Sequence, residues 1–171
     1  MNNYTSVNRH KYYLKVHLVF VCKYRKELLV NNDIDFKVKQ IFKDTESKSD
    51  FIIDIMETDI DHMHLLVSYP PKISISSIVC KLKQGSTISL WEHFPVYLSK
   101  QFWKEHTFWS DSYFACSIGE ASPETIRRYI ENQGQWHSSS RLKINGFFCL
   151  RQYKKIENSL LPVHRVCHIY G

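Results

Sequence analysis

Two short apolar segments most constrain the fold of this chain, namely FIIDIMETDI at residues 51–60 and MHLLVSY at residues 63–69. Apolar runs of this length that are rich in β-branched residues and bounded by turn-forming residues predict β-strands. An acidic turn joins the two segments. Pro70 and Pro71 end the second one, because proline cannot donate a ladder hydrogen bond. The sequence therefore predicts two consecutive strands here.

Strand and helix patterns alternate on either side of this pair. Residues 12–22 are rich in β-branched and aromatic residues and predict a strand. Residues 33–48 carry apolar residues at helical spacing, with Asp33 as the expected cap. Ser74 begins a second helix, which continues toward Trp91. A predicted helix thus precedes the two central strands and another follows them.

The later part of the chain adds one strand and one helix. An aromatic and basic connector at 94–109 leads to a predicted strand at 112–118. Ser122, Pro123 and Glu124 then supply a cap, a first-turn proline and a first-turn acid, which predict the start of a helix. The order β-α-β-β-α-β, followed by one more helix, predicts an α+β fold with a ferredoxin-like (RRM-like) antiparallel sheet. Two helices cover one face of such a sheet, and the other face is free to carry a site.

The net charge of +6 is unevenly distributed along the chain. Residues 1–26 contain six Lys and Arg and no acidic residue, and residues 136–171 contain six and one, whereas the stretch between them is net acidic. Basic clusters of this kind are typical of proteins that meet phosphates, although a soluble domain with charged termini has the same pattern. We expect a domain at 1–135 and a basic extension at 136–171. No apolar run reaches the length of a membrane span and the N-terminus lacks a signal-peptide pattern, so we expect a cytoplasmic protein.

His62 and His64 begin the second of the two central strands, with Met63 between them. Because side chains alternate along a strand, both imidazoles are predicted to point to one face while Met63 points to the core. Two neighbouring histidines can hold one cation, and Asp59 and Asp61 keep the surroundings anionic. A His-x-His pair alone is a weak signal, because it also occurs by chance.

Tyr129 and Gln133 are predicted to lie one turn apart on the last helix, in the segment TIRRYIENQ. A tyrosine between two isoleucines on such a stripe is usually part of a core. Two features favour a site instead. A buried Gln133 would need hydrogen-bond partners, and Arg127 and Arg128 would place positive charge where a phosphate approaches.

The combination of an acidic turn, His-x-His on a strand and a later helix with Tyr-x-x-x-Gln resembles the HUH endonucleases. More closely, the chain is similar to the single-tyrosine (TnpA-like) transposases of bacterial and archaeal insertion sequences, which include the repeat-associated tyrosine transposases. The similar segments are HLVFVCKYRKELL at 17–29, DIDHMHLLVSYPPKISISSIVCKLKQGS at 59–86 and FWSDSYFACSIGEASPETIRRYIENQ at 108–133. They cover most of residues 12–135 in the order of the family.

The resemblance implies a reaction and the residues that perform it. Tyr129 would be the nucleophile that cleaves and rejoins single-stranded DNA through a 5′-phosphotyrosine. His62 and His64 would bind Mg²⁺ or Mn²⁺, with Gln133 as a third ligand from the helix. Such a metal neutralises charge on the phosphate and stabilises the departing 3′-oxygen.

The resemblance also implies partners. The family recognises DNA hairpins at the ends of its insertion sequence and acts as a homodimer, in which the tyrosine helix packs on the partner subunit so that the active sites are shared. Arg25, Lys26 and Lys83 are the residues that we expect to contact DNA.

Three other functions remain open at this point. A ferredoxin-like sheet can bind RNA without catalysis, although histidines stand here where RNA-recognition domains carry aromatic residues. An HUH nickase of replication or plasmid transfer is commonly a larger chain, often with two tyrosines. A catalytically inactive, domesticated protein of the same fold that binds single-stranded nucleic acid would retain the same residues.

Overall fold

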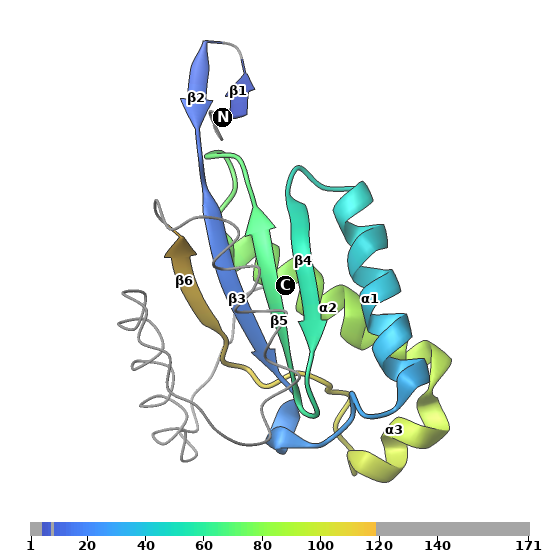
Figure 1. Ribbon diagram of the computed structural model, residues 1–171. Coiled ribbons are helices and arrows are strands. Elements are labelled where there is room, and N and C mark those ends of the chain that lie inside the picture. Colours follow the sequence, from blue (N-terminus) through green and yellow to red (C-terminus); the bar gives the residue numbers. More distant parts are fainter. Residues whose placement is uncertain (1–4, 8, 119–171) are drawn as a thin grey trace, which may run out of the picture. The chain divides into compact units, whose positions relative to one another are not determined.

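The computed structural model describes residues 5–7 and 9–118, all within one compact unit that spans Met1–His137. The elements follow one another as strand β1 Thr5–Val7, strand β2 His10–Tyr12, strand β3 Lys15–Val21, the short 3₁₀ segment η1 Lys23–Arg25, helix α1 Asn32–Ser47, strand β4 Ile52–Thr58, strand β5 His62–Ser68, helix α2 Ile75–His93, helix α3 Pro95–Gln101 and strand β6 Phe114–Ile118 (Figure 1). The helix predicted after Ser122 and the domain boundary predicted at 135 lie outside the described residues.

Strands β4, β5, β3 and β6 form an antiparallel sheet in that order, with β5 and β3 at its centre (Figure 1). The register places His64 opposite Val19 of β3 on one side and opposite Glu57 of β4 on the other. The two central strands of the sequence prediction, the antiparallel sheet and the mixture of strands with helices are thus confirmed.

The two faces of the sheet differ in what they contact. Met63, Leu65 and Val67 of β5 are fully buried in the main core, together with apolar residues of α1 and α2. Helix α2 passes behind the sheet in the view of Figure 1, and α1 runs beside β4. Because side chains alternate along β5, His62 and His64 lie on the opposite face, as the sequence predicts.

Local chain chemistry determines where the helices begin. Ser74 caps α2 as predicted, since its side chain accepts a hydrogen bond from the Ser77 amide. For α1 the expected cap, Asp33, was wrong. The cap is Asn31, whose side-chain oxygen accepts hydrogen bonds from the amides of Asp33 and Ile34.

Two elements differ from the sequence prediction. The strand predicted at 12–22 is interrupted, and its first residue, Tyr12, belongs to a small hairpin in which β2 pairs with β1. Arg9 in that hairpin has φ 70°, a left-handed conformation that arginine rarely adopts. The residue type at this position therefore did not indicate a turn. The predicted connector at 94–109 contains the helix α3, whose first residue is Pro95.

The segment between α3 and β6 is fastened to both the sheet and α2. Trp109 pairs with Cys22 in an isolated bridge and is buried, and its indole nitrogen donates to Ser86 Oγ at 2.8 Å. The Ser110 amide donates to the carbonyl of Val21 at 2.8 Å. These contacts fix the chain as it approaches β6, which then pairs with β3 beside the histidines.

Candidate functional site

Strand β5 holds His62 and His64 next to each other on the sheet face that α1 and α2 leave free. Their rings meet edge to face, with centroids 4.9 Å apart. His64 is only 3% exposed, and the side chain of His62 is 12% exposed. The sequence prediction that these two imidazoles stand side by side is confirmed by this geometry.

His62 is held by a charged neighbour. Its Nδ1 lies 2.8 Å from Asp61 Oδ1, and the other carboxylate oxygen of Asp61 lies 2.9 Å from Arg25 Nε. Burial alone would raise the pKa of Asp61, but its hydrogen bond to His62 and the charge of Arg25 lower that pKa below its ordinary value. Asp61 is therefore a carboxylate that accepts a hydrogen from Nδ1 of His62, so that the Nε2 lone pair is available for a ligand.

The chain reaches this arrangement through an unusual turn. Tyr24 and Arg25 in η1 have φ 60° and 52°, so two consecutive residues other than glycine are left-handed. The turn is anchored where Cys22 N donates to the carbonyl of Asp61 at 2.8 Å. Backbone strain of this kind persists where the surrounding contacts hold it, and here it accompanies the ion pair between Arg25 and Asp61.

His64 has a different neighbour, His17 of β3, which the sequence analysis did not single out. His17 Nε2 lies 3.0 Å from His64 Nδ1, and the two rings are stacked with an interplanar angle of 12°. Burial lowers the pKa of His17 to about 4, and burial together with the two neighbouring histidines lowers the pKa of His64 to about 3. Both rings are therefore neutral at pH 7, which is the form that binds a metal.

One buried atom of His64 has no hydrogen-bond partner among the residues that the structure describes. Of the buried side-chain polar atoms in the described part of the chain, only His64 Nε2 and Asp35 Oδ1 have no hydrogen-bond partner. Leaving such an atom unsatisfied costs about 1–3 kcal/mol. His62 Nε2 is also without a close contact to its neighbouring acid, since it lies 3.9 Å from Asp59 Oδ2.

The donor set fits a divalent cation of the Mg²⁺ or Mn²⁺ class only in part. Two imidazoles that both engage Nδ1 and offer Nε2 supply two nitrogen ligands. Within residues 5–7 and 9–118, no group of three or more His, Cys, Asp or Glu is placed to hold a metal ion. The third predicted ligand, Gln133, and the predicted nucleophile, Tyr129, lie outside the described residues.

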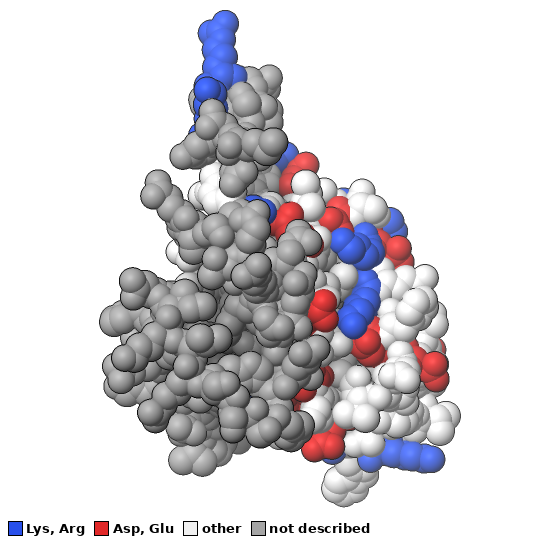
Figure 2. Space-filling view, viewed as in Figure 1, with Lys and Arg blue, Asp and Glu red and all other residues white. Residues whose placement is uncertain are grey.

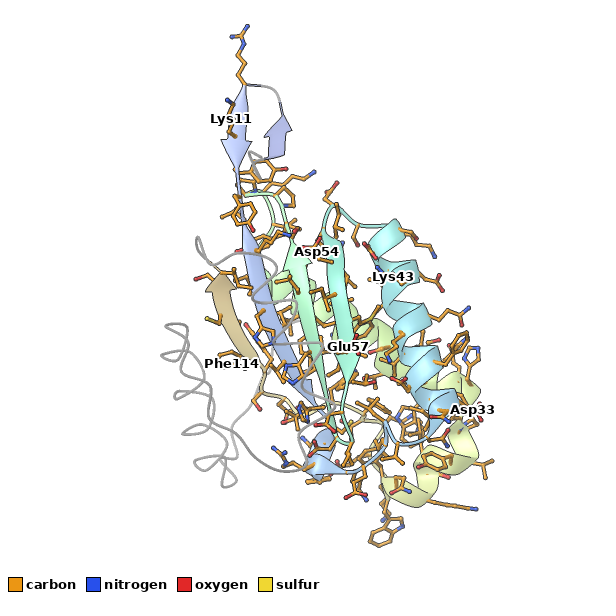
Figure 3. The ribbon with its side chains drawn as sticks, in the orientation of Figure 1. Lys11, Asp33, Lys43, Asp54, Glu57 and Phe114 are labelled. Atoms are coloured by element: carbon orange, nitrogen blue, oxygen red, sulfur yellow. The ribbon has the colours of Figure 1, made fainter. Side chains whose placement is uncertain are left out.

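The residues beside the histidines are of two kinds. Glu57 lies on β4 opposite His64, and the ring of Phe114 on β6 meets His17 edge to face at 6.2 Å. Figure 3 labels both residues, on strands at opposite edges of the sheet. An acid and an aromatic ring thus flank the histidines from the two edge strands.

The residues predicted to contact DNA occupy three different places. Arg25 belongs to the site through its ion pair with Asp61. Lys26 lies over the ring of Phe102, 5.5 Å from its centroid. Lys83 donates to the main-chain carbonyls of 110–112 just before β6, and burial lowers its pKa to about 8. Contact between these side chains and DNA stays a prediction.

Charge on the surface of α1 and β4 is mixed. Figure 2 shows basic and acidic side chains interspersed there. Several of them pair, for example Lys39 with Asp35 at 2.9 Å and Lys43 with Glu46 at 2.8 Å. A surface of mixed sign gives little attraction for a phosphate backbone, so this face does not favour nucleic acid.

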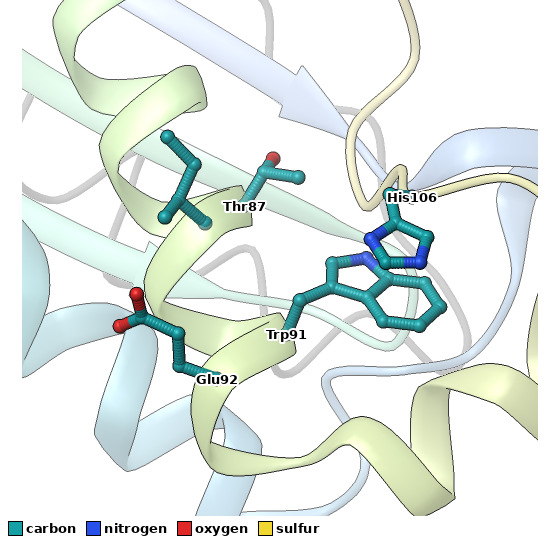
Figure 4. A pocket seen from close by; sticks show the side chains of 5 residues that line it. Thr87, Trp91, Glu92 and His106 are labelled. Carbon is teal, nitrogen blue, oxygen red and sulfur yellow. The ribbon is translucent and has the colours of Figure 1, made fainter.

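A pocket on α2 contains none of the predicted site residues. It is lined by Thr87, Ile88, Trp91 and Glu92 of the helix and by His106, whose ring stacks on that of Trp91 with centroids 4.3 Å apart (Figure 4). Trp91 Nε1 also donates to the carbonyl of Thr107 at 2.9 Å. The Trp91–His106 stack thus ties α2 to the segment that follows α3.

Comparison with known proteins identifies the family. The family model described as "Transposase IS200 like" matches residues 10–133, which is well over half of the chain. The chain belongs to the IS200-like transposase family. Transposases of this family cut DNA and transfer strands, so this IS200-like transposase is an enzyme of that class. None of its helices in the described ranges is long and apolar enough to cross a membrane.

Individual relatives agree with this assignment. The ISDra2 transposase TnpA of Deinococcus radiodurans is 32% identical over 122 residues, which are 71% of this chain and 85% of the relative. The transposase for insertion sequence element IS200 of Salmonella typhimurium is 29% identical over 133 residues, covering 78% of this chain and 85% of that protein.

Two solved structures are also similar. A Deinococcus radiodurans protein described as a candidate transposase has a TM-score of 0.60 at 29% identity, covering 79% of this chain and 99% of the other. A REP-associated tyrosine transposase bound to a REP hairpin has a TM-score of 0.50 at 12% identity, covering 98% and 94%. At that identity the second likeness concerns the fold alone.

Proposed function

We propose that this IS200-like transposase cleaves and rejoins single-stranded DNA at the ends of an insertion sequence, through a 5′-phosphotyrosine on Tyr129. The observation that carries the proposal is the pair of imidazoles on β5. His62 and His64 are adjacent, both engage Nδ1 with a neighbour, and His64 Nε2 is buried without a partner in the described part of the chain. A cation ligated there would satisfy that atom.

The residues have separable roles in this reaction. His62, His64 and Gln133 would hold Mg²⁺ or Mn²⁺, which when bound supplies positive charge to the scissile phosphate. The phenol of Tyr129 has an ordinary pKa of about 10 and is a weak nucleophile unless its target is made electrophilic. Tyr129 attacks phosphorus, the 3′-oxygen leaves, and the bond to tyrosine conserves the energy needed for rejoining.

We extend the proposal to fold, substrate and assembly. The strand order β4-β5-β3-β6 and the alternation of strands and helices support a ferredoxin-like sheet, with Tyr129 on a further helix. The REP-associated tyrosine transposase was solved with a REP hairpin, which supports a DNA hairpin as the ligand here. We infer a homodimer with shared active sites that works in the cytoplasm.

The test uses single-stranded DNA that contains the hairpins flanking the coding sequence, labelled separately at its two ends. With Mn²⁺, wild-type protein should become covalently attached to the fragment downstream of the cut. Tyr129→Phe should give no adduct, because the ring stays and only the nucleophilic oxygen is lost. His64→Ala should bind the hairpin but not cleave it.

Each contrary result has a definite meaning. Mn²⁺-dependent cleavage by His64→Ala would remove His64 from the metal site. An adduct with the upstream fragment would overturn the polarity and the mechanism. Hairpin binding by wild type without any adduct would favour the inactive, domesticated single-stranded nucleic-acid-binding protein instead.

A further inference from the structure

We propose that His17 is a positioning residue for His64: its Nε2 accepts a hydrogen bond from His64 Nδ1 and so fixes the tautomer and ring direction in which His64 offers Nε2 to the metal. This rests on the proposed function, in which His64 is a ligand. Their ring nitrogens are 3.0 Å apart and their rings are nearly parallel.

The sheet itself brings the two rings together. On β3, Val19 lies opposite His64 and His17 lies opposite Leu66. His17 is therefore the diagonal neighbour of His64 on the same face, at a separation that long side chains bridge. This contact depends on the register, because a shift of one residue would turn His17 to the helix side.

Hydrogen counting decides the direction of the bond. A neutral imidazole, which is the form that ligates a metal, has one N–H and one lone pair. If His64 carried its hydrogen on Nε2, that buried N–H would have no acceptor among the described residues. If His64 carries it on Nδ1, the hydrogen meets His17 Nε2 and the lone pair at Nε2 is left for a cation. The second arrangement satisfies both atoms.

The two ligands are then supported in different ways. Asp61, a carboxylate paired with Arg25, contacts the Nδ1 of His62, whereas the imidazole of His17 contacts the Nδ1 of His64. Partners that hold the second nitrogen of a ligating histidine change metal affinity by about 10–100-fold when they are removed.

The test measures Mn²⁺ binding to the full-length protein by electron paramagnetic resonance, independently of cleavage. His17→Leu removes the acceptor and should weaken binding by about 10–100-fold. His17→Gln is the matched control, because its amide oxygen reaches to about the position of Nε2 and can accept the same hydrogen bond. It should stay within about threefold of wild type. Thermal unfolding of both variants checks that they fold.

Further measurements separate the outcomes. Nitrogen-15 NMR of the metal-free wild type should show His64 protonated at Nδ1, whatever the variants do. A hydrogen on Nε2, or equal Mn²⁺ affinity of wild type and a folded His17→Leu, would overturn the role of His17. His64→Ala should abolish Mn²⁺ binding. If it does not, the proposed metal site fails, and the role of His17 fails with it.

Discussion

The bond between Ser86 and Trp109 offers a quantitative test of how the fold is held. Both residues are buried, at 0% and 3% exposure, and the indole nitrogen donates to Ser86 Oγ at 2.8 Å. In Ser86→Ala the indole N–H loses its acceptor in a site that water does not reach. The carbonyl of Leu82, to which Ser86 Oγ donates, also accepts the helical amide bond within α2, so it is not orphaned.

The cost therefore comes almost entirely from the indole. A buried donor without a partner costs about 1–3 kcal/mol, so we expect Ser86→Ala to lower the free energy of unfolding by about 2 kcal/mol. For a protein of this length that corresponds to a fall in Tm of about 4–8 °C. Urea unfolding followed by tryptophan fluorescence and circular dichroism measures the change.

A double-mutant cycle isolates the bond from packing. Trp109→Phe also lowers the free energy of unfolding, because it removes buried ring volume. The phenylalanine ring, however, has no N–H that needs an acceptor. In the Trp109→Phe background, Ser86→Ala should therefore cost less than about 0.5 kcal/mol, which gives a coupling of more than about 1 kcal/mol. A loss below about 0.5 kcal/mol in the single Ser86→Ala variant, or strict additivity, would refute the reasoning.

Two further predictions concern α2. Gly85→Ala should raise the free energy of unfolding by about 0.5–1 kcal/mol, since the added methyl meets, among the described residues, only Thr45 Oγ1 at 3.9 Å. A lower free energy of unfolding in urea would mean that the space between the helices cannot accept the methyl group. Because burial lowers the pKa of Lys83 from 10.5 to about 8, the unfolded chain binds more protons between those pH values, and stability rises with pH. Wild type should therefore gain stability relative to Lys83→Met across that window, whereas a constant difference would contradict the lowered pKa.

Much of the sheet was predictable because its signals are local. The strands β4 and β5 are bounded by an acidic turn and by Pro70 and Pro71, and Ser74 caps the helix that follows. Side chains alternate between the two faces of a strand. Once Met63 is assigned to the core, His62 and His64 must therefore lie on the opposite face. These features need only neighbours within a few residues.

What the sequence could not supply depends on distant parts of the chain. A single histidine on β3 has no local mark of function, and His17 becomes significant only once the β3–β5 register is known. Asn31 and Asp33 are equally good caps by residue type, and the tertiary packing of α1 selects the first. Helix α3 has only seven residues, which is too short for a helical period to be recognised.

The different supports of the two histidines have a consequence for motion. Strand β5 is hydrogen-bonded on both sides, to β3 and to β4, so its amides exchange with solvent only when the sheet opens. Arg25 sits on a short left-handed turn outside the sheet, and its side chain is 49% exposed. Hydrogen exchange should therefore be slower at His64, inside the sheet, than at Arg25, in the turn. The ion pair between Arg25 and Asp61 can therefore break without opening the sheet, whereas we expect the bond between His17 and His64 to persist as long as the sheet does.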